Sequence, residues 1–386
     1  MLKKGEEPKF NYITYGETCK SDQVEMFINH MIDCNKNMDR PTPVCIWGMA
    51  GIGKTSIVEQ IANKKGYDFR YVSPAQFEEM GDMLGMPYVS KEIITNADGS
   101  KTEISETKYA IPEWVPTTDG PGILLIDDVN RADDRILRGI MQLLQNYELM
   151  SWKLPKGWQI VLTANPDGGD YSVTSMDDAM ITRMMHITMK FDVKDWAIWA
   201  ENNGIDERGI NFMLKYPEVI NGEQTNPRSI TAFFNAIRTI KDLRANIPLV
   251  NMLSKSALDK DAAISFQQFI NDNLIDLINP DDIITAKDFK TVKSKIEEQM
   301  QPVKGAGIRN DIAMIITTRF VNYLGVDKER TFSKEEISNI VDFLKLEVIP
   351  KDMLMSMIKD INRISDAIKG LKKVLMADGV IDKVMK

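Results

Sequence analysis

A glycine-rich segment at residues 48–56, GMAGIGKTS, has the spacing of a loop that binds phosphate. Glycines let the backbone turn tightly and bring amide N–H groups close to phosphate oxygens. A lysine adds a mobile positive charge, and a threonine hydroxyl can ligate Mg²⁺ beside the phosphates. The pattern therefore predicts a site for a nucleoside triphosphate, ATP or GTP, and for Mg²⁺. Thr55 is expected to be a metal ligand, and the nucleotide is expected to be held by Gly48, Met49, Ala50, Gly51, Ile52, Gly53, Lys54, Thr55 and Ser56.

Two aspartates follow the apolar run GILLI, which has the composition of a buried strand. Ligands bind at the carboxyl ends of parallel strands, so both carboxylates are expected beside the phosphate-binding loop. We expect Asp127 to hold Mg²⁺ through its water shell. Asp128 is then the residue that orients or deprotonates the water that attacks the γ-phosphate.

A second apolar run, QIVLTA, ends at Asn165 and Pro166. An amide side chain at the end of a strand can hydrogen-bond both the attacking water and a γ-phosphate oxygen. An Asn-Pro pair alone is a common turn signal. Its position about 35 residues after the two aspartates favours a sensing role for Asn165.

Arginines stabilise the charge of a phosphoryl group in transfer, from the same chain or from a neighbour. Arg183 follows a short helical stretch and precedes the last expected strand of the α/β region. Arg228 lies in the first turn of a helix further on. A third arginine, Arg131, is a weaker candidate, which we expect to pair with Asp133 or Asp134.

Short apolar runs alternate with helical stretches between residues 40 and 190, which predicts a mostly parallel sheet with helices on its faces. The expected strands are Val44–Trp47, Phe69–Val72, Ile123–Ile126, Gln159–Thr163 and His186–Met189. Beyond residue 192 the apolar spacing is helical. Good helix caps stand at Asp192, at Asn226 before a proline, and at Ser333 three residues before a glutamate. The amphipathic stretch at residues 311–324 is expected to pack into a core.

Residues 81–117 are expected to form a long loop, with a hairpin turn at Asn96–Ser100. A long insertion between two strands of a compact domain is usually functional or mobile. Its exposed parts are candidates for contact with another molecule.

The loop, the double aspartate, the Asn-Pro pair and the two arginines occur in an order that resembles the AAA+ ATPases, more narrowly their MoxR-like branch of the dynein-related type. The likeness covers about residues 40–240. It includes the stretches FRYVSPAQFEEMGDMLGMP, WVP, ILLIDDVNRADDRILRGIMQLLQ, LPKGWQIVLTANP and MDDAMITRM.

The resemblance implies a P-loop NTPase fold, α/β with a parallel sheet flanked by helices, followed by a helical lid and a helical C-terminal extension. We therefore expect an N-terminal helical or linker segment at residues 1–40, the nucleotide-binding domain at 41–191, the lid at 192–300 and the extension at 301–386. The resemblance gives each motif a role: Walker A for Gly48–Thr55, Walker B for Asp127 and Asp128, sensor 1 for Asn165, arginine finger for Arg183 and sensor 2 for Arg228.

The resemblance also implies an ATPase that assembles with itself into a ring, typically of six, and remodels a partner protein, often one with a von Willebrand A domain. An arginine finger of this kind reaches the nucleotide of the adjacent subunit. The chain departs from the family at Asp128, where most members have glutamate. The shorter side chain affects the expected turnover rate more than nucleotide binding.

Composition excludes several other classes of protein. The formal charge of −8 disfavours a surface that binds nucleic acid or lipid throughout. Three cysteines without C-x-x-C spacing and two distant histidines give neither a disulfide framework nor a zinc site. No apolar stretch is long enough to span a membrane, and the first residues lack the apolar segment of a signal peptide. A cytoplasmic location is therefore expected.

Two alternatives stay open beside the remodelling ATPase. One is an ATPase that handles nucleic acid, such as a loader or a restriction-type motor, because Lys and Arg outnumber Asp mildly over residues 351–386. The other is a slow nucleotide switch, which the aspartate at position 128 favours.

Overall fold

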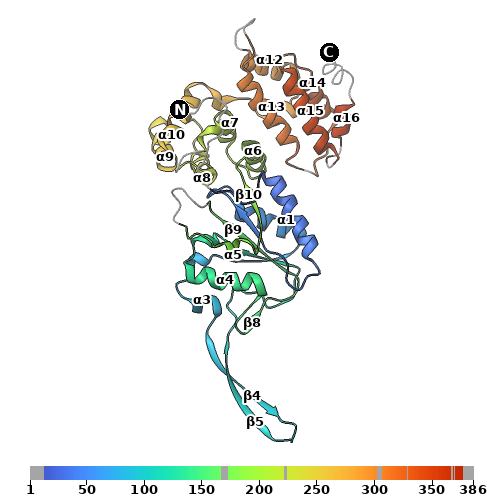
Figure 1. The fold of residues 1–386 in the computed structure, drawn as a ribbon. Helices are drawn as coiled ribbons and strands as arrows, with labels where there is room; N and C mark the ends of the chain where they lie inside the picture. Colours follow the sequence, from blue (N-terminus) through green and yellow to red (C-terminus); the bar gives the residue numbers. More distant parts are fainter. Residues whose placement is uncertain are drawn as a thin grey trace. The chain divides into compact units, whose positions relative to one another are not determined.

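The computed structural model describes residues 13–166, 173–220, 224–301, 307–327, 329–366, 368 and 370–376. The chain folds as two compact units, Met1–Phe191 and Asp192–Lys386, and many of their elements are labelled in Figure 1. The finer boundaries expected at residues 40/41 and 300/301 stay predictions.

A six-stranded parallel sheet forms the centre of the first unit, in the order β1-β10-β2-β9-β6-β3. Its strands are β1 Glu17–Cys19, β2 Val44–Trp47, β3 Asp68–Val72, β6 Gly122–Ile126, β9 Trp158–Ala164 and β10 Met185–Met189. The five expected strands are thus confirmed to within a residue at each end. Strand β1 was not expected, because it is three residues long, lies at the sheet edge and buries one side chain.

Helices cover both faces of this sheet. Helices α1 (Ser21–Asn35) and α2 (Lys54–Lys65) pack on one face, and α3 (Met80–Leu84) and α4 (Asp134–Asn146) pack on the other. Strand β6 is buried on both sides: Ile123 and Leu125 contact the first layer, while Leu124 and Ile126 contact the second. Helix α5 (Asp178–Ile181) precedes β10. The expected α/β class, a parallel sheet flanked by helices, is confirmed.

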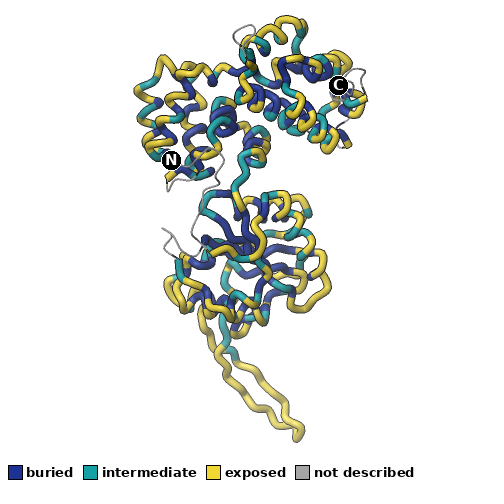
Figure 2. The backbone as a smooth tube through the Cα atoms, turned by 45° about the horizontal axis from the view of Figure 1, so that its top comes forward, coloured by how far each residue is buried: buried dark blue, intermediate teal, exposed yellow. Residues whose placement is uncertain are grey.

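The inserted segment forms a regular antiparallel hairpin of β4 (Pro87–Thr95) and β5 (Lys101–Tyr109). The expectation of a loop is therefore wrong for these residues, although the turn lies at Asn96–Ser100, where two backbone hydrogen bonds close it. Both strands are exposed along almost their whole length (Figure 2). A much shorter hairpin joins β7 (Glu148–Leu149) to β8 (Trp152–Lys153).

The second unit is helical in all its described residues. Its helices are α6 Val193–Asn202, α7 Glu207–Lys215, α8 Pro227–Ile237, α9 Ile247–Ala257, α10 Lys260–Asn271, α11 Pro280–Ile284, α12 Phe289–Met300, α13 Asn310–Leu324, α14 Lys334–Leu344, α15 Lys351–Ser365 and α16 Leu371–Leu375. Short 3₁₀ turns lie at Pro217–Val219 and Leu274–Asp276 in this unit, and at Pro74–Gln76 and Val129–Arg131 in the first unit.

Helix caps in this unit follow the expected residues. Asp192, Asn226 and Ser333 each accept backbone N–H bonds at the start of α6, α8 and α14. A local turn follows helix α8. The helix ends at Ile237, and the carboxylate of Asp242 accepts the N–H groups of the second and third residues that follow it, a local turn that competes with helix.

Apolar side chains of α13 are buried, in agreement with its expected place in a core. Among the residues that the structure describes, none of the helices combines the length and apolar character needed to cross a membrane.

Candidate functional site

The glycine-rich loop joins the buried strand β2 to helix α2. A Cβ at Gly48 would lie 2.6 Å from Cδ1 of Ile52 and 2.7 Å from the carbonyl oxygen of Met189, so this position excludes any side chain. Gly53 caps α2 with φ 98°, a left-handed conformation that favours glycine. Because no side chain caps this helix, its first-turn N–H groups and its dipole can serve an anion.

Lys54 begins α2 and is only 5% exposed. Its Nζ donates to the carbonyl oxygens of Gly48 (2.7 Å) and Met49 (3.1 Å) and to Oδ1 of Asn165 (3.1 Å). The ammonium therefore lies over the loop and joins it to the end of β9, the strand next to β2.

Asp127, at the end of β6, accepts hydrogen bonds from three hydroxyl groups on three different elements. Its Oδ1 accepts from Oγ1 of Thr55 (2.7 Å) and Oγ1 of Thr163 (2.6 Å), and its Oδ2 accepts from the hydroxyl of Tyr71 (3.2 Å). Burial, followed by the charge of Asp127, raises the pKa of Tyr71, which keeps the phenol protonated as a donor.

Asp128 adopts a left-handed backbone conformation, with φ 49° and ψ 45°. Its N–H donates to Oγ1 of Thr163 (2.8 Å), and its Oδ1 accepts from Nδ2 of Asn165 (3.0 Å). Its Oδ2 lies 3.2 Å from Nε of Arg131.

The expectation that Arg131 pairs with Asp133 or Asp134 is wrong. Asp133 caps α4 by accepting the N–H of Ile136, and Asp134 forms an ion pair with Arg138 one helical turn on. Both carboxylates thus stabilise α4, and Arg131 forms its ion pair with Asp128 instead.

Asn165 lies between the lysine and the second aspartate and is fully buried. Its Oδ1 faces the ammonium of Lys54 and its Nδ2 faces the carboxylate of Asp128, which is the orientation that the charges require. The side chain of Asn130 fixes it further, because it exchanges two hydrogen bonds (3.0 and 2.8 Å) with the backbone of Asn165.

The structure thus brings together Lys54, Thr55, Asp127, Asp128 and Asn165, which the sequence singled out. It adds Thr163, Tyr71 and Asn130, which had no expected role at the phosphate site, and Arg131, which was only a weaker candidate among the arginines. The sequence did contain one indication of a role for Thr163. Residues two positions apart on a strand face the same side, so Thr163 is expected on the side of Asn165.

The two predicted arginines lie in different units of the chain. Arg183 bonds to Oε1 of Gln145 on α4 (3.1 and 3.3 Å) and to the carbonyl oxygen of Ala179. Arg228 is exposed in the first turn of α8, in the second unit. The side chain of Ser56 also lies in an exposed position on α2. The roles given to these residues stay predictions.

The donor set suits Mg²⁺. This cation keeps several waters and binds through one or two carboxylates together with substrate phosphates. The Thr55 hydroxyl and the Asp127 carboxylate, 2.7 Å apart, offer such oxygen ligands. They lie next to the loop in which Gly48 admits no side chain. Across the described part of the chain, His, Cys, Asp and Glu form no group of three or more that could hold a metal by itself.

Comparison with known proteins agrees with this geometry. Residues 43–184 match the family model of the AAA domain (dynein-related subfamily). The matched segment contains the loop, both aspartates, Asn165 and Arg183, whereas Arg228 lies outside it.

Individual relatives are distant. Midasin of Giardia intestinalis is 22% identical over 166 residues, which make up 40% of this chain and 3% of midasin. The Holliday junction branch migration motor RuvB of Thermotoga maritima has a TM-score of 0.36 at 13% identity, over 76% of this chain and 80% of RuvB. A putative ATPase from Cytophaga hutchinsonii has a TM-score of 0.32 at 13% identity, over 88% and 89%. At such low TM-scores the structural similarities carry no functional argument.

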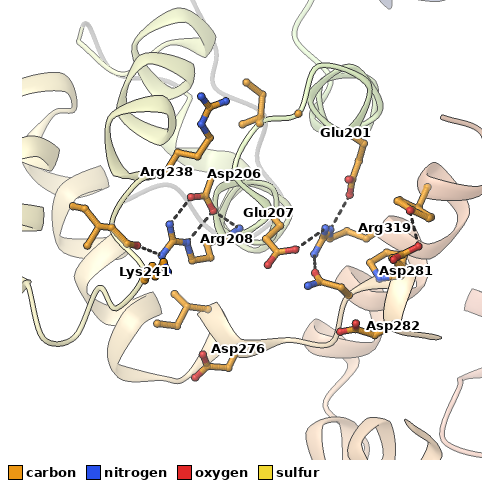
Figure 3. A pocket seen from close by; sticks show the side chains of 17 residues that line it. Glu201, Asp206, Glu207, Arg208, Arg238, Lys241, Asp276, Asp281, Asp282 and Arg319 are labelled. Carbon is orange, nitrogen blue, oxygen red and sulfur yellow. Dashed lines mark hydrogen bonds and ion pairs between the residues drawn. The ribbon is translucent and has the colours of Figure 1, made fainter. Parts of the chain in front are cut away.

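A polar cavity of about 700 Å³ lies within the helical unit (Figure 3). Arg319 of α13, 4% exposed, donates to Glu201 (2.8 Å), to Asn211 (3.2 Å) and to Asn279 (3.3 Å). Beside it, Arg208 forms a two-pronged ion pair with Asp206, which raises the pKa of the arginine. These buried pairs connect α6, α7 and α13, and we assign them a structural role.

Proposed function

We propose that the protein is a Mg²⁺-dependent ATPase of the MoxR-like branch, which forms a ring, typically of six subunits, and remodels a partner protein. The observation that carries the ATPase part is the convergence of Lys54, Asp127, Asp128 and Asn165 beside a loop with uncapped helix N–H groups. This arrangement combines an anion site, a metal site and a base.

Each side chain has a task in this proposal. Loop amides and Lys54 bind the phosphates, Thr55 and Asp127 hold Mg²⁺, and Asp128 accepts a hydrogen bond from the attacking water. Asn165 orients that water, because it already bonds to both Lys54 and Asp128. The cation, when bound, neutralises charge on the β- and γ-phosphates.

The contacts of Arg183 support the proposal that the protein forms a ring. The guanidinium is bonded to Gln145 and Ala179, and none of its described contacts is with Lys54, Asp127 or Asp128. A transferring phosphoryl group needs more positive charge than Lys54 supplies, and an arginine from a neighbouring copy can provide it. The remodelled partner in this proposal is a protein, such as one with a von Willebrand A domain.

Calorimetry and a phosphate-release assay test the ATPase proposal. We expect Mg²⁺-dependent ATP binding and slow turnover in the natural protein. Lys54→Ala should weaken ATP binding at least about tenfold, since it removes a buried charge from the phosphates. Lys64→Ala, on the outer surface of the same helix, is the control and should bind ATP normally. If the natural protein shows no Mg²⁺-dependent affinity for ATP, the proposal is wrong.

A further inference from the structure

Thr163 is the residue through which the two aspartates of the site are joined. It lies near the end of β9, is fully buried, and pairs through its backbone with Ile46 of β2. Its hydroxyl has one proton, donated to Oδ1 of Asp127 at 2.6 Å, and a lone pair that accepts the N–H of Asp128 at 2.8 Å. One oxygen atom therefore bonds to both acidic residues.

The two bonds control different features. The bond to Asp127 holds a carboxylate in one rotamer, with Oδ1 toward Thr55. The bond to Asp128 satisfies a backbone N–H at a residue with φ 49°, a conformation that non-glycine residues adopt at a cost. A β-branched side chain has restricted χ1 freedom, so the central strand sets the position of this hydroxyl before any ligand arrives.

We propose that Thr163 is a positioning residue for the metal and the attacking water: it sets the Asp127 carboxylate for Mg²⁺ and the backbone of Asp128 for the water. This inference rests on the proposed ATPase function. Thr163 touches neither the nucleotide nor the metal and acts through the two aspartates. Residues one step removed from a metal ligand typically change metal affinity or activity by about 10- to 100-fold when they are replaced.

Three variants separate this role from a purely structural one. Thr163→Val keeps the shape and removes the hydroxyl, while Thr163→Ser keeps the hydroxyl. Thr188→Val is the matched control, because Thr188 is also buried in the central sheet (3% exposed) and donates its hydroxyl to the carbonyl oxygen of Tyr15 at 2.8 Å. Deleting either hydroxyl should lower the melting temperature.

The measurements are ADP binding by calorimetry, with Mg²⁺ and with EDTA, and ATP turnover. We expect Thr163→Val to lose about 10- to 100-fold of its Mg²⁺-dependent ADP affinity and of its turnover, with ADP affinity in EDTA unchanged. Thr163→Ser should recover most of both. Thr188→Val should keep the affinities and the turnover of the natural protein.

Two results overturn the inference. One is a folded Thr163→Val protein with natural Mg²⁺-dependent affinity and turnover, and the other is an equal loss in Thr188→Val. If Thr163→Val does not fold, Thr163→Cys, whose thiol is a weak donor, is judged by the same criteria. Failure of the natural protein to bind Mg²⁺-ATP would instead refute the proposed function on which the inference rests.

Discussion

His186 on β10 is held in a single neutral form by its two neighbours. Its Nδ1 accepts the indole N–H of Trp47 at 2.9 Å, so the ring proton is on Nε2, which donates to the carbonyl oxygen of Ile181 at 2.7 Å. Burial lowers the pKa of this histidine. A second proton on Nδ1 would face the indole N–H directly.

This histidine predicts a pH dependence of stability. The unfolded chain takes up a proton near pH 6.5, whereas the folded chain resists protonation until lower pH. The free energy of unfolding should therefore fall as pH decreases from about 7 to 5.5. His186→Gln should flatten this dependence in thermal melts, and His30→Gln, on the exposed surface of α1, should not. An unchanged slope in His186→Gln would show that another group is responsible.

At the scale of residues, the sequence predicted the site side chains that stand in recognisable motifs. It missed those whose role depends on a contact with a residue far away in the chain. Lys54 and Asp127 stand in recognisable motifs. Thr163 looks like an ordinary β-branched strand residue until Asp127, 36 positions away, is placed beside it. Arg131 was assigned to its neighbours in the chain, but those neighbours cap and pair within α4.

At the scale of elements, the β4–β5 hairpin differs most from its prediction. A strand with one buried face alternates apolar and polar residues, which makes it visible in a sequence. Here Val89 and Ile93 lie on one face, Tyr88 and Ile94 lie on the other, and all four are exposed. Apolar and polar residues therefore do not alternate along this strand. Its pairing is set by the turn and by cross-strand contacts, so its sequence looks like that of an irregular loop.

The exposed hairpin should be dispensable for folding. Pro87 and Tyr109 are opposite each other at its base, so residues 88–108 can be replaced by an Asn-Gly turn. Because nearly all the removed side chains are exposed, we expect the free energy of unfolding to change by about 0.5 kcal/mol or less. Urea titration and Mg²⁺-ATP calorimetry measure both properties. A large loss of stability, or of nucleotide affinity, would assign the hairpin a role in the folding or the nucleotide site of the first unit.

At the scale of the whole molecule, the proposed ring requires two copies to complete one site. Arg183→Ala should bind ATP normally and lose at least about 10³-fold in turnover, the low end of what such an arginine contributes. Asp128→Asn should also be inactive. A mixture of the two variants should regain part of the turnover, because some interfaces then pair an intact arginine with an intact aspartate.

The control for this experiment is Arg135→Ala. Arg135 is an exposed residue on α4 whose guanidinium lies 3.9 Å from the carboxylate of Asp133. It should keep natural turnover. If co-purification of differently tagged variants shows mixed assemblies and the two inactive variants still give no turnover together, Arg183 does not act across a subunit boundary.

The buried cation of α13 bears on how much of the chain is needed. Arg319 lies beyond residue 300, while its acceptors Glu201, Asn211 and Asn279 all lie before it. A protein truncated at residue 300 would lose α13 and with it the guanidinium that joins Glu201, Asn211 and Asn279. We therefore expect the last quarter of the chain to contribute to the stability of the helices that precede it.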